Sequence, residues 1–390
     1  MPPRERLSLF VFIDAFGWEI LRGQEFLADV LAARSPLQTV FGYSSTCDPT
    51  ILTGLAPRDH GHFSFFCYDP AASPFGLCRY LRFLPKSVTR RGRVRRLLSR
   101  ALRWWHGYTG YFQIYNMPFD KLPLFDYSEK RDLYMPGGIN SGALTVFDHL
   151  RSSGAPFLLS DWRASEERNL AALEQGLERG EARFGYVYLA AMDAVLHAHG
   201  ARSKAGAEKI AWYERRLWRV LDIAAKSYQE TRLFVFSDHG MTDVRDTCDL
   251  MARINALDLV FGRDYAACYD STMARFWLLN DKARPAIEAA LAQEPKGDIL
   301  SDAKLAEYGC DFPDRRYGDL FFLMKPGVLL CPSFMGETRL AGMHGYAPED
   351  KDSVAMFATN VRLERPPARL ADMFGLMMSE AGLEGAGAKS

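Results

Sequence analysis

Short apolar runs of strand length recur along the chain and are separated by amphipathic stretches. The clearest runs are Leu7–Ile13, Tyr186–Ala191 and Leu233–Phe236, and such segments are typical of central strands that are covered on both faces. Ala205–Lys226 is amphipathic with a helical period, and Leu170–Glu181 also looks helical. This alternation predicts an α/β fold, a three-layer sandwich with a mostly parallel central sheet.

Two segments depart from this alternation. Residues 62–140 are rich in aromatic residues and are interrupted by prolines, and residues 256–330 contain strand-like runs near Met273–Leu279 and Leu320–Met324. We therefore expect a single domain over residues 1–390, with insertions at about 62–140 and about 256–330 that form a cap or lid.

Composition and charge narrow the choice of partner and compartment. Lys+Arg and Asp+Glu each number 48, so the net charge gives no reason to expect a nucleic-acid partner. The seven cysteines are scattered and show no C-x-x-C spacing, which favours reduced thiols over a disulfide framework. The apolar run near the N-terminus lacks a small-residue cleavage site, and no stretch reaches the roughly twenty apolar residues of a membrane span. We expect a cytoplasmic protein.

Local charge is uneven, because residues 79–105 are strongly basic and contain no acidic residue up to Arg103. Apolar and aromatic residues interleave with the basic ones at roughly helical spacing. The pattern fits two interpretations equally: a solvated helix face packed on the body, or contact with an anionic membrane or an acidic substrate. The basic residues are Arg79, Arg82, Lys86, Arg90, Arg91, Arg93, Arg95, Arg96, Arg100 and Arg103.

Carboxylates and imidazoles follow the predicted strands, at the sheet edge where open α/β folds place their sites. Alone, each has a structural alternative, such as a helix cap or a core histidine. Together they suit Zn²⁺, with Mn²⁺ or Fe as alternatives, and they divide well between two ions. Two ions about 4 Å apart can stabilise the attacking and leaving oxygens of a phosphoryl displacement. The candidates are Asp14, Asp193 with His197 four residues later, Asp238, His239 and the glycine-flanked His344.

A cluster of hydroxyl residues, Ser44, Ser45 and Thr46, precedes the segment Pro49–Gly54. The proline near its start and the glycine after its end predict a short helix whose N-terminus faces the hydroxyls. Such an end favours an oxyanion or a phosphate. The alternative is a serine-rich capping turn.

These motifs, in this order, resemble the type I phosphodiesterase/nucleotide pyrophosphatase branch of the alkaline phosphatase superfamily. The resemblance rests on an aspartate at the end of an early strand, a hydroxyl residue ten positions before a glycine, and three short motifs. Those elements are Asp14, Ser44 with Gly54, D-x-x-x-H-x-x-G at Asp193–Gly200, SDHGM at Ser237–Met241, and MHGY at Met343–Tyr346.

The resemblance implies an alkaline phosphatase-like fold and metal-dependent hydrolysis of phosphate esters, first of all by a phosphodiesterase or nucleotide pyrophosphatase that forms a phosphoenzyme. It implies two divalent metal ions, and zinc is the first candidate for both. Counting from Gly54 makes Ser44 the nucleophile, with Thr46 and then Ser45 as alternatives. The implied ligands are Asp193, His197 and His344 for one ion, and Asp14, Asp238, His239 and the Ser44 oxygen for the other.

Several related activities stay open at this point. A phosphomonoesterase, a phosphonate hydrolase, a sulfatase or a phospho-group transferase of the same superfamily are alternatives. A formylglycine sulfatase is disfavoured, because Ile51 stands where the Cys/Ser-x-Pro-x-Arg motif beginning at Cys47 requires arginine. A metal-stabilised binding protein is the alternative that is not an enzyme. The basic, aromatic segment suggests a small-molecule or lipid-linked phosphoester as substrate.

Overall fold

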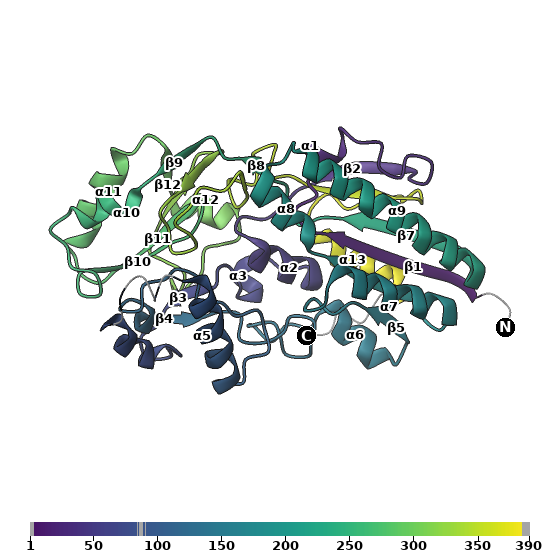
Figure 1. The fold of residues 1–390 in the computed structure, drawn as a ribbon, viewed down its shortest axis with the longest axis horizontal. Helices are drawn as coiled ribbons and strands as arrows, with labels where there is room; N and C mark the ends of the chain where they lie inside the picture. The colour runs from purple at the N-terminus through teal and green to yellow at the C-terminus, as the bar shows by residue number, and fades with distance from the viewer. Residues whose placement is uncertain (1–3, 84, 86–88, 90, 384–390) are drawn as a thin grey trace.

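A computed structural model describes residues 4–83, 85, 89 and 91–383 (Figure 1). Its central sheet has six strands in the order β2-β16-β7-β1-β6-β5. Strands β7, β1, β6 and β5 are parallel, whereas β16 is antiparallel to both β7 and β2. The strands are β1 (Arg4–Ile13), β2 (Ala33–Leu37), β5 (Phe157–Leu159), β6 (Phe184–Leu189), β7 (Tyr228–Phe236) and β16 (Ala355–Thr359).

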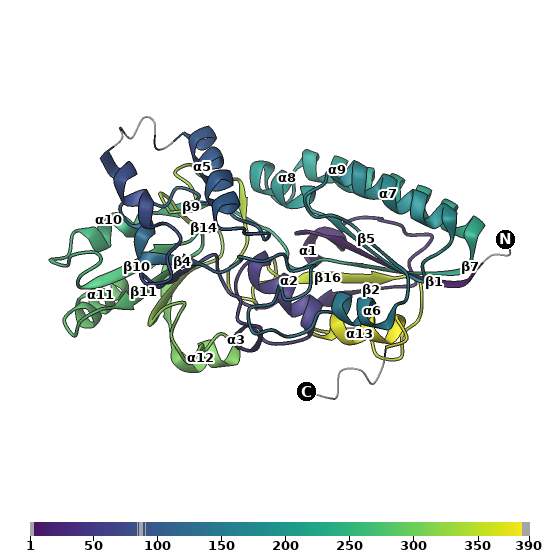
Figure 2. The ribbon, with the colours of Figure 1, turned by 90° about the horizontal axis from the view of Figure 1, so that it is seen from below.

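Helices cover both faces of this sheet (Figure 2). Helices α7 (Glu166–Arg179) and α9 (Lys204–Ser227) pack on one face, and α2 (Ser44–Thr53), α6 (Val146–Ser153) and α13 (Asp372–Glu380) pack on the other. The predicted three-layer α/β sandwich is therefore confirmed, with a mixed sheet whose antiparallel member is β16.

Strand β1 shows why the sheet needs both layers. Leu9 and Val11 belong to the core beneath α7 and α9, whereas Phe10 and Phe12 belong to the core beneath α2 and α13. The side chains of a strand alternate between the two faces of its sheet, so an uninterrupted apolar run must be buried on both. The ring of Phe12 stacks between Tyr188 of β6 and Phe236 of β7, with centroids 4.8 and 5.2 Å apart.

A second lobe is built on an antiparallel sheet of four strands in the order β10-β11-β13-β12. Its helices are α10 (Leu250–Asn255), α11 (Ala283–Ala292) and α12 (Asp302–Glu307). The strands are β10 (Tyr265–Tyr269), β11 (Met273–Leu278), β12 (Gly297–Leu300) and β13 (Leu320–Met324).

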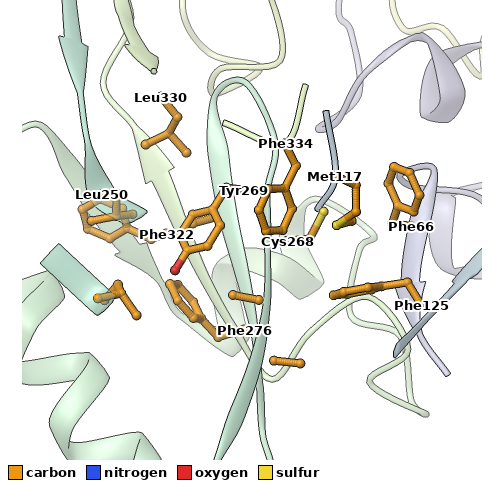
Figure 3. Packing of buried hydrophobic residues seen from close by; sticks show 14 of the residues in the cluster. Phe66, Met117, Phe125, Leu250, Cys268, Tyr269, Phe276, Phe322, Leu330 and Phe334 are labelled. Atoms are coloured by element: carbon orange, nitrogen blue, oxygen red, sulfur yellow. The ribbon is translucent and has the colours of Figure 1, made fainter. Parts of the chain in front are cut away.

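Residues from the segment 62–140 pack against this sheet and share its core (Figure 3). Phe66 and Phe125, from the paired strands β3 (Phe66–Tyr68) and β4 (Phe125–Tyr127), lie in one cluster with Tyr269 and Phe276. The second segment and most of the first therefore form one lobe beside the central sheet, whereas Leu133, Tyr134 and Ile139 of the first segment pack in the core of the central sheet.

Short elements join the two lobes or extend from them. Two short strand pairs connect distant parts of the chain: β8 pairs with β15 in antiparallel orientation, and β9 pairs with β14 in parallel orientation. No helix among the described residues is long and apolar enough to cross a membrane. The remaining elements are α1 (Trp18–Leu21), α3 (Pro57–His60), η1 (Gly76–Phe83), α5 (Gly92–Trp105), η2 (Leu122–Leu124), α8 (Ala191–His199), β8 (Thr242–Asp243), β9 (Asp246–Cys248), β14 (Val328–Leu330) and β15 (Gly342–Met343).

Helix α2 begins earlier than Pro49 suggested. The N–H groups of Thr46 and Cys47 donate to the carbonyl of Tyr43, which closes the first turn before the proline is reached. Ser44, Ser45 and Thr46 are therefore the first residues of the helix, and Pro49 lies inside it. The helix ends at Gly54, which has a positive φ of 72° and so takes a conformation that glycine adopts readily.

Candidate metal centre

The predicted donor residues come together at the carboxyl ends of the central strands. Asp14 directly follows β1, and Asp238 and His239 follow β7. Asp193 and His197 lie on α8, which begins two residues after β6 ends, and His344 follows β15. Because parallel strands end at the same edge of a sheet, all six side chains reach one region.

Three of these residues form a first buried group, which we call the Asp14 group: Asp14, Asp238 and His239. Their candidate ligand atoms lie within 4.8 Å of one another. His239 Nε2 is 3.0 Å from Asp238 Oδ2 and 3.8 Å from Asp14 Oδ1. The backbone N–H of Ala15 donates to Asp238 Oδ1, and the Tyr188 hydroxyl donates to Asp14 Oδ2. These bonds fix both carboxylates from outside the group.

The other three residues form a second group, the Asp193 group: Asp193, His197 and His344. Asp193 Oδ1 lies 3.1 Å from His197 Nε2 and 3.5 Å from His344 Nε2. His197 Nδ1 is 2.9 Å from the carbonyl of Gly342. A proton on that nitrogen is donated to the carbonyl and leaves Nε2 to face the group, as metal-binding histidines are commonly held.

The two groups adjoin through their histidines. The rings of His239 and His344 stack with centroids 3.7 Å apart and an interplanar angle of 11°. His344 is more than a hundred residues distant in sequence from both α8 and β7, and the pairing of β15 with β8 brings it to them. The site is thus completed only when the chain returns from the second lobe.

The donor set fits divalent cations. Several oxygen and nitrogen atoms at the site are buried without a hydrogen-bond partner, and burying such atoms without compensation is costly. Divalent cations held by the two groups would supply the missing partners of the three carboxylate oxygens. The unpartnered atoms at the site are Asp14 Oδ1, Asp193 Oδ1, Asp238 Oδ2 and His344 Nδ1.

The electrostatics of the Asp14 group agree with this interpretation. Burial, with the nearby Asp238 carboxylate, holds the pKa of Asp14 well above its usual value. Burial opposes the charge of His239, but Asp238 outweighs it and raises the pKa of that imidazole to about 9. In the metal-free protein the group therefore retains protons that a bound cation would displace.

Only one of the three candidate hydroxyls faces this centre. Ser44 Oγ lies 3.2 Å from His239 Nε2. Ser45 Oγ and Thr46 Oγ1 instead donate to the carbonyl of Phe63, at 3.1 and 2.6 Å. The geometry thus separates Ser44 from its two neighbours, which sequence counting alone left as alternatives.

Residues of both groups, Asp14 from the first and Asp193, His197 and His344 from the second, line a cavity of about 460 Å³. Its wall is largely aromatic, and its acidic residues include several that the sequence did not single out as site residues. Neither Glu129 nor Tyr111 belongs to a motif, and both lie in the irregular segment 62–140. The aromatic residues that line the cavity are Tyr43, Phe65, Tyr111, Tyr115, Tyr134, Trp162 and Tyr188, and the acidic ones beyond the metal centre are Asp48, Glu129, Asp132 and Asp270.

Comparison with known proteins identifies the family to which the chain belongs. A family model described as type I phosphodiesterase/nucleotide pyrophosphatase matches residues 9–347. No curated protein sequence gives a significant match.

Among solved structures, murine ectonucleotide pyrophosphatase/phosphodiesterase 5, in an inactive form with AMP, is similar with a TM-score of 0.69 at 15% identity. That alignment covers 97% of this chain and 96% of the murine one. The human counterpart gives 0.68 at 14% identity and covers 97% and 95%. At this identity, the structures establish a shared fold, whereas the family match spans most of the chain. The chain belongs to the type I phosphodiesterase/nucleotide pyrophosphatase family of the alkaline phosphatase superfamily, and is a hydrolase that acts on phosphoester bonds.

Proposed function

We propose that the chain is a phosphodiesterase that uses Ser44 as its nucleophile and holds two divalent ions. Zn²⁺ is the preferred ion, and Mn²⁺ or Fe are the alternatives. The observation that carries the proposal is the position of Ser44 Oγ, 3.2 Å from His239 Nε2, at the junction of two three-residue donor groups. Asp193, His197 and His344 would hold one ion. Asp14, Asp238 and His239 would hold the other, beside Ser44.

Bound divalent ions supply two effects here: they lower the pKa of a neighbouring hydroxyl, and they neutralise charge on phosphoryl oxygens. The chain contributes the nucleophile and its orientation. Ser44 Oγ attacks phosphorus, the bond to the leaving oxygen breaks, and a phosphoseryl enzyme forms. Water then attacks the same phosphorus and releases the serine.

Helix α2 contributes a further feature of the site. Ser44 is its first residue, so the N–H groups of Ser44 and Ser45 and the positive end of the helix dipole lie beside the reacting oxygen. Such an end stabilises a phosphoryl oxyanion. Donors arranged in this way contribute about 3 kcal/mol to transition-state stabilisation in comparable sites.

The size of the cavity favours a diester over a monoester. A volume of about 460 Å³ falls within the range of about 300–1,000 Å³ of sites that bind small organic molecules. It leaves room for a substituent beside the phosphoryl group. The murine relative was solved with AMP, and a nucleotide-sized substituent is compatible with this volume.

The direct test compares Ser44→Ala with Ser45→Ala on bis-p-nitrophenyl phosphate, p-nitrophenyl phosphate and p-nitrophenyl sulfate. We expect wild type to prefer the diester, and Ser44→Ala to lose at least about 1,000-fold in kcat, since a nucleophile cannot be replaced by its neighbours. Ser45→Ala should stay within about tenfold of wild type. A Ser44→Ala enzyme with full diesterase activity would refute Ser44 as the nucleophile. A wild-type preference for the monoester or the sulfate would contradict the phosphodiesterase assignment and favour a phosphomonoesterase or a sulfatase.

We also propose that the outer face of the second lobe contacts an anionic membrane, which would bring the site to lipid-linked phosphodiesters. Large apolar side chains on η1 and α5 are exposed among the arginines of this basic segment, and α5 projects from the lobe in Figure 2. Basic helices with exposed tryptophans bind the interface of anionic bilayers. Lys86, Arg90 and the side chain of Arg82 lie outside the described part of the chain. The exposed side chains are Leu77, Tyr80, Phe83, Leu97, Trp104 and Trp105.

Vesicle co-sedimentation tests this surface. Wild type should bind vesicles that contain phosphatidylserine in low salt, release in high salt, and ignore vesicles of phosphatidylcholine alone. Trp104→Ala with Trp105→Ala should weaken binding, because these rings are 81% and 73% exposed and contribute little to folding. If wild type does not bind these vesicles in low salt, the proposed membrane contact of this surface is wrong. The expected cytoplasmic location, which would present it to an anionic leaflet, stays a prediction.

A further inference from the structure

A wall of aromatic rings stands beside the metal centre and has no role in the chemistry described above. Phe65 lies at its middle, with the rings of Tyr111 and Tyr115 at centroid distances of 5.4 and 5.6 Å. Trp162 continues the wall, 6.3 Å from Tyr111. All four line the cavity. Aromatic faces carry negative electrostatic potential, so several rings around one space favour a cation there.

A buried carboxylate completes this wall. Glu129, two residues after β4, lines the cavity and is 6% exposed. Its side chain makes no hydrogen bond and no ion pair with any residue that the structure describes. A buried charge in that position is costly unless it is paired.

Of the other acidic residues that line the cavity beyond the metal centre, Asp132 and Asp270 are paired, whereas Asp48 Oδ1 on α2, like Glu129, has no hydrogen-bond partner among the described residues. Asp132 accepts from Trp162 Nε1 at 3.0 Å and pairs with Arg163 at 2.9 Å. Asp270 pairs with the buried guanidinium of Arg275 at 2.8 Å. These carboxylates are held by the protein itself, whereas Glu129 is left for something that enters the cavity.

The position of Glu129 links the ring wall to the nucleophile. Burial, with a smaller contribution from the Glu129 carboxylate, raises the pKa values of Tyr111 and Tyr115 in the wall and of Asp48 on helix α2, the helix that begins at Ser44. Glu129, the four rings and Ser44 all line the same cavity. Arg131 is the one lysine or arginine among the described lining residues; it is exposed and donates to the carbonyl of Gly137.

We propose that Glu129 and the rings of Phe65, Tyr111, Tyr115 and Trp162 bind an organic ammonium group carried by the substrate. The substrate class is then a phosphodiester of an amino alcohol, with a quaternary or protonated nitrogen a few bonds from phosphorus. This inference rests on the proposed phosphodiesterase function and adds the chemistry of the group that the cavity selects. Such recognition combines a charge pair that water reaches poorly with cation–π contacts, each of which strengthens in a desolvated pocket.

The test uses a matched pair of substrates. p-Nitrophenyl phosphorylcholine carries the quaternary nitrogen, and p-nitrophenyl 3,3-dimethylbutyl phosphate replaces that nitrogen with carbon at the same shape. Wild type should prefer the cationic ester at least about tenfold in kcat/KM. Equal rates on both esters by an enzyme that hydrolyses bis-p-nitrophenyl phosphate would overturn the subsite while leaving the proposed function intact. No hydrolysis of any diester would instead overturn the proposed function.

Variants test which residues of the subsite produce the preference for the cationic ester. Glu129→Gln keeps the shape of the side chain and removes its charge, so the ratio of kcat/KM on the cationic ester to that on the neutral ester should fall close to one. Glu208→Gln, on the exposed surface of α9 with a side chain 67% exposed, should keep the wild-type ratio. Tyr111→Phe should keep the preference and Tyr111→Leu should reduce it, because only the latter removes the ring. An unchanged ratio in Glu129→Gln would remove this carboxylate from the subsite.

If Glu129→Gln does not fold, inhibition of wild type gives the answer. Choline should inhibit the hydrolysis of bis-p-nitrophenyl phosphate at concentrations at which 3,3-dimethylbutanol does not. Equal inhibition by the two alcohols would contradict an ammonium subsite.

Discussion

Glu129→Gln should stabilise the free protein although it removes a residue of the cavity. Burial raises the pKa of this carboxyl from 4.5 to about 8, so the folded protein holds the proton more tightly than the unfolded chain does. For a group shifted in this direction, ionisation costs stability once the pH exceeds 4.5, and the cost grows until the pH passes about 8. Glutamine has the same shape and does not ionise.

The size of the effect follows from the shift. One pKa unit corresponds to about 1.36 kcal/mol. Glu129 therefore lowers the free energy of unfolding by less than about 1 kcal/mol at pH 5, by about 3 kcal/mol at pH 7 and by about 5 kcal/mol at pH 9. A chain of 390 residues unfolds with an entropy of about 0.8 kcal/mol per kelvin. The melting temperature of Glu129→Gln should therefore exceed that of wild type by roughly 4 °C at pH 7, and by about 1 °C at pH 5.

Thermal unfolding of the two proteins, measured side by side from pH 5 to pH 9, tests this reasoning. The contribution of the metal centre is common to both proteins at each pH and cancels in the difference. Glu208→Gln should show no such trend, because its side chain is 67% exposed. Added choline should reduce the difference by stabilising wild type alone. A difference that does not grow with pH would refute the account of Glu129 as an unpaired buried carboxyl.

Three further changes probe the metal centre and the lobe that completes it. His197→Ala removes a donor of the Asp193 group and should lower the metal content, measured by elemental analysis, by about one ion per chain. His199 is exposed, and His199→Ala should leave the metal content unchanged. Gly345→Ala should destabilise the protein by about 2 kcal/mol or more in urea unfolding, because φ is 87° and the new Cβ would lie 2.4 Å from the ring of Tyr43; Gly375→Ala, with nothing within 4 Å, should not. Arg275→Met should cost about 3–5 kcal/mol on the same assay, since it leaves the Asp270 carboxylate buried and unpaired.

Sequence reasoning located the candidate metal donors because strand ends are visible in the hydrophobic pattern. Asp14 and Asp238 each follow an apolar run directly, and parallel strands bring such positions to one edge. The same reasoning left the nucleophile open, since Ser44, Ser45 and Thr46 differ only in the direction of their hydroxyls. That direction depends on the carbonyl of Phe63, which accepts from two of them and belongs to another segment.

The ring wall and Glu129 were beyond the reach of sequence patterns for a different reason. Tyr111, Tyr115 and Glu129 lie in a segment without helical or strand periodicity, where the hydrophobic pattern does not indicate which side chains turn inward. Tyr115, for example, packs against the core of the second sheet, whose strands begin more than a hundred residues later. The early start of helix α2 was hidden similarly, because Pro49 lies inside the helix and not at its first turn.

The metal requirement of diester hydrolysis tests the central claim most directly. Elemental analysis of the purified protein, followed by removal of the metal with a chelator and assay on bis-p-nitrophenyl phosphate, measures it. The two donor groups predict two divalent ions per chain, loss of activity on chelation, and recovery on addition of Zn²⁺ or Mn²⁺. Full diesterase activity in protein that contains no metal would contradict the account.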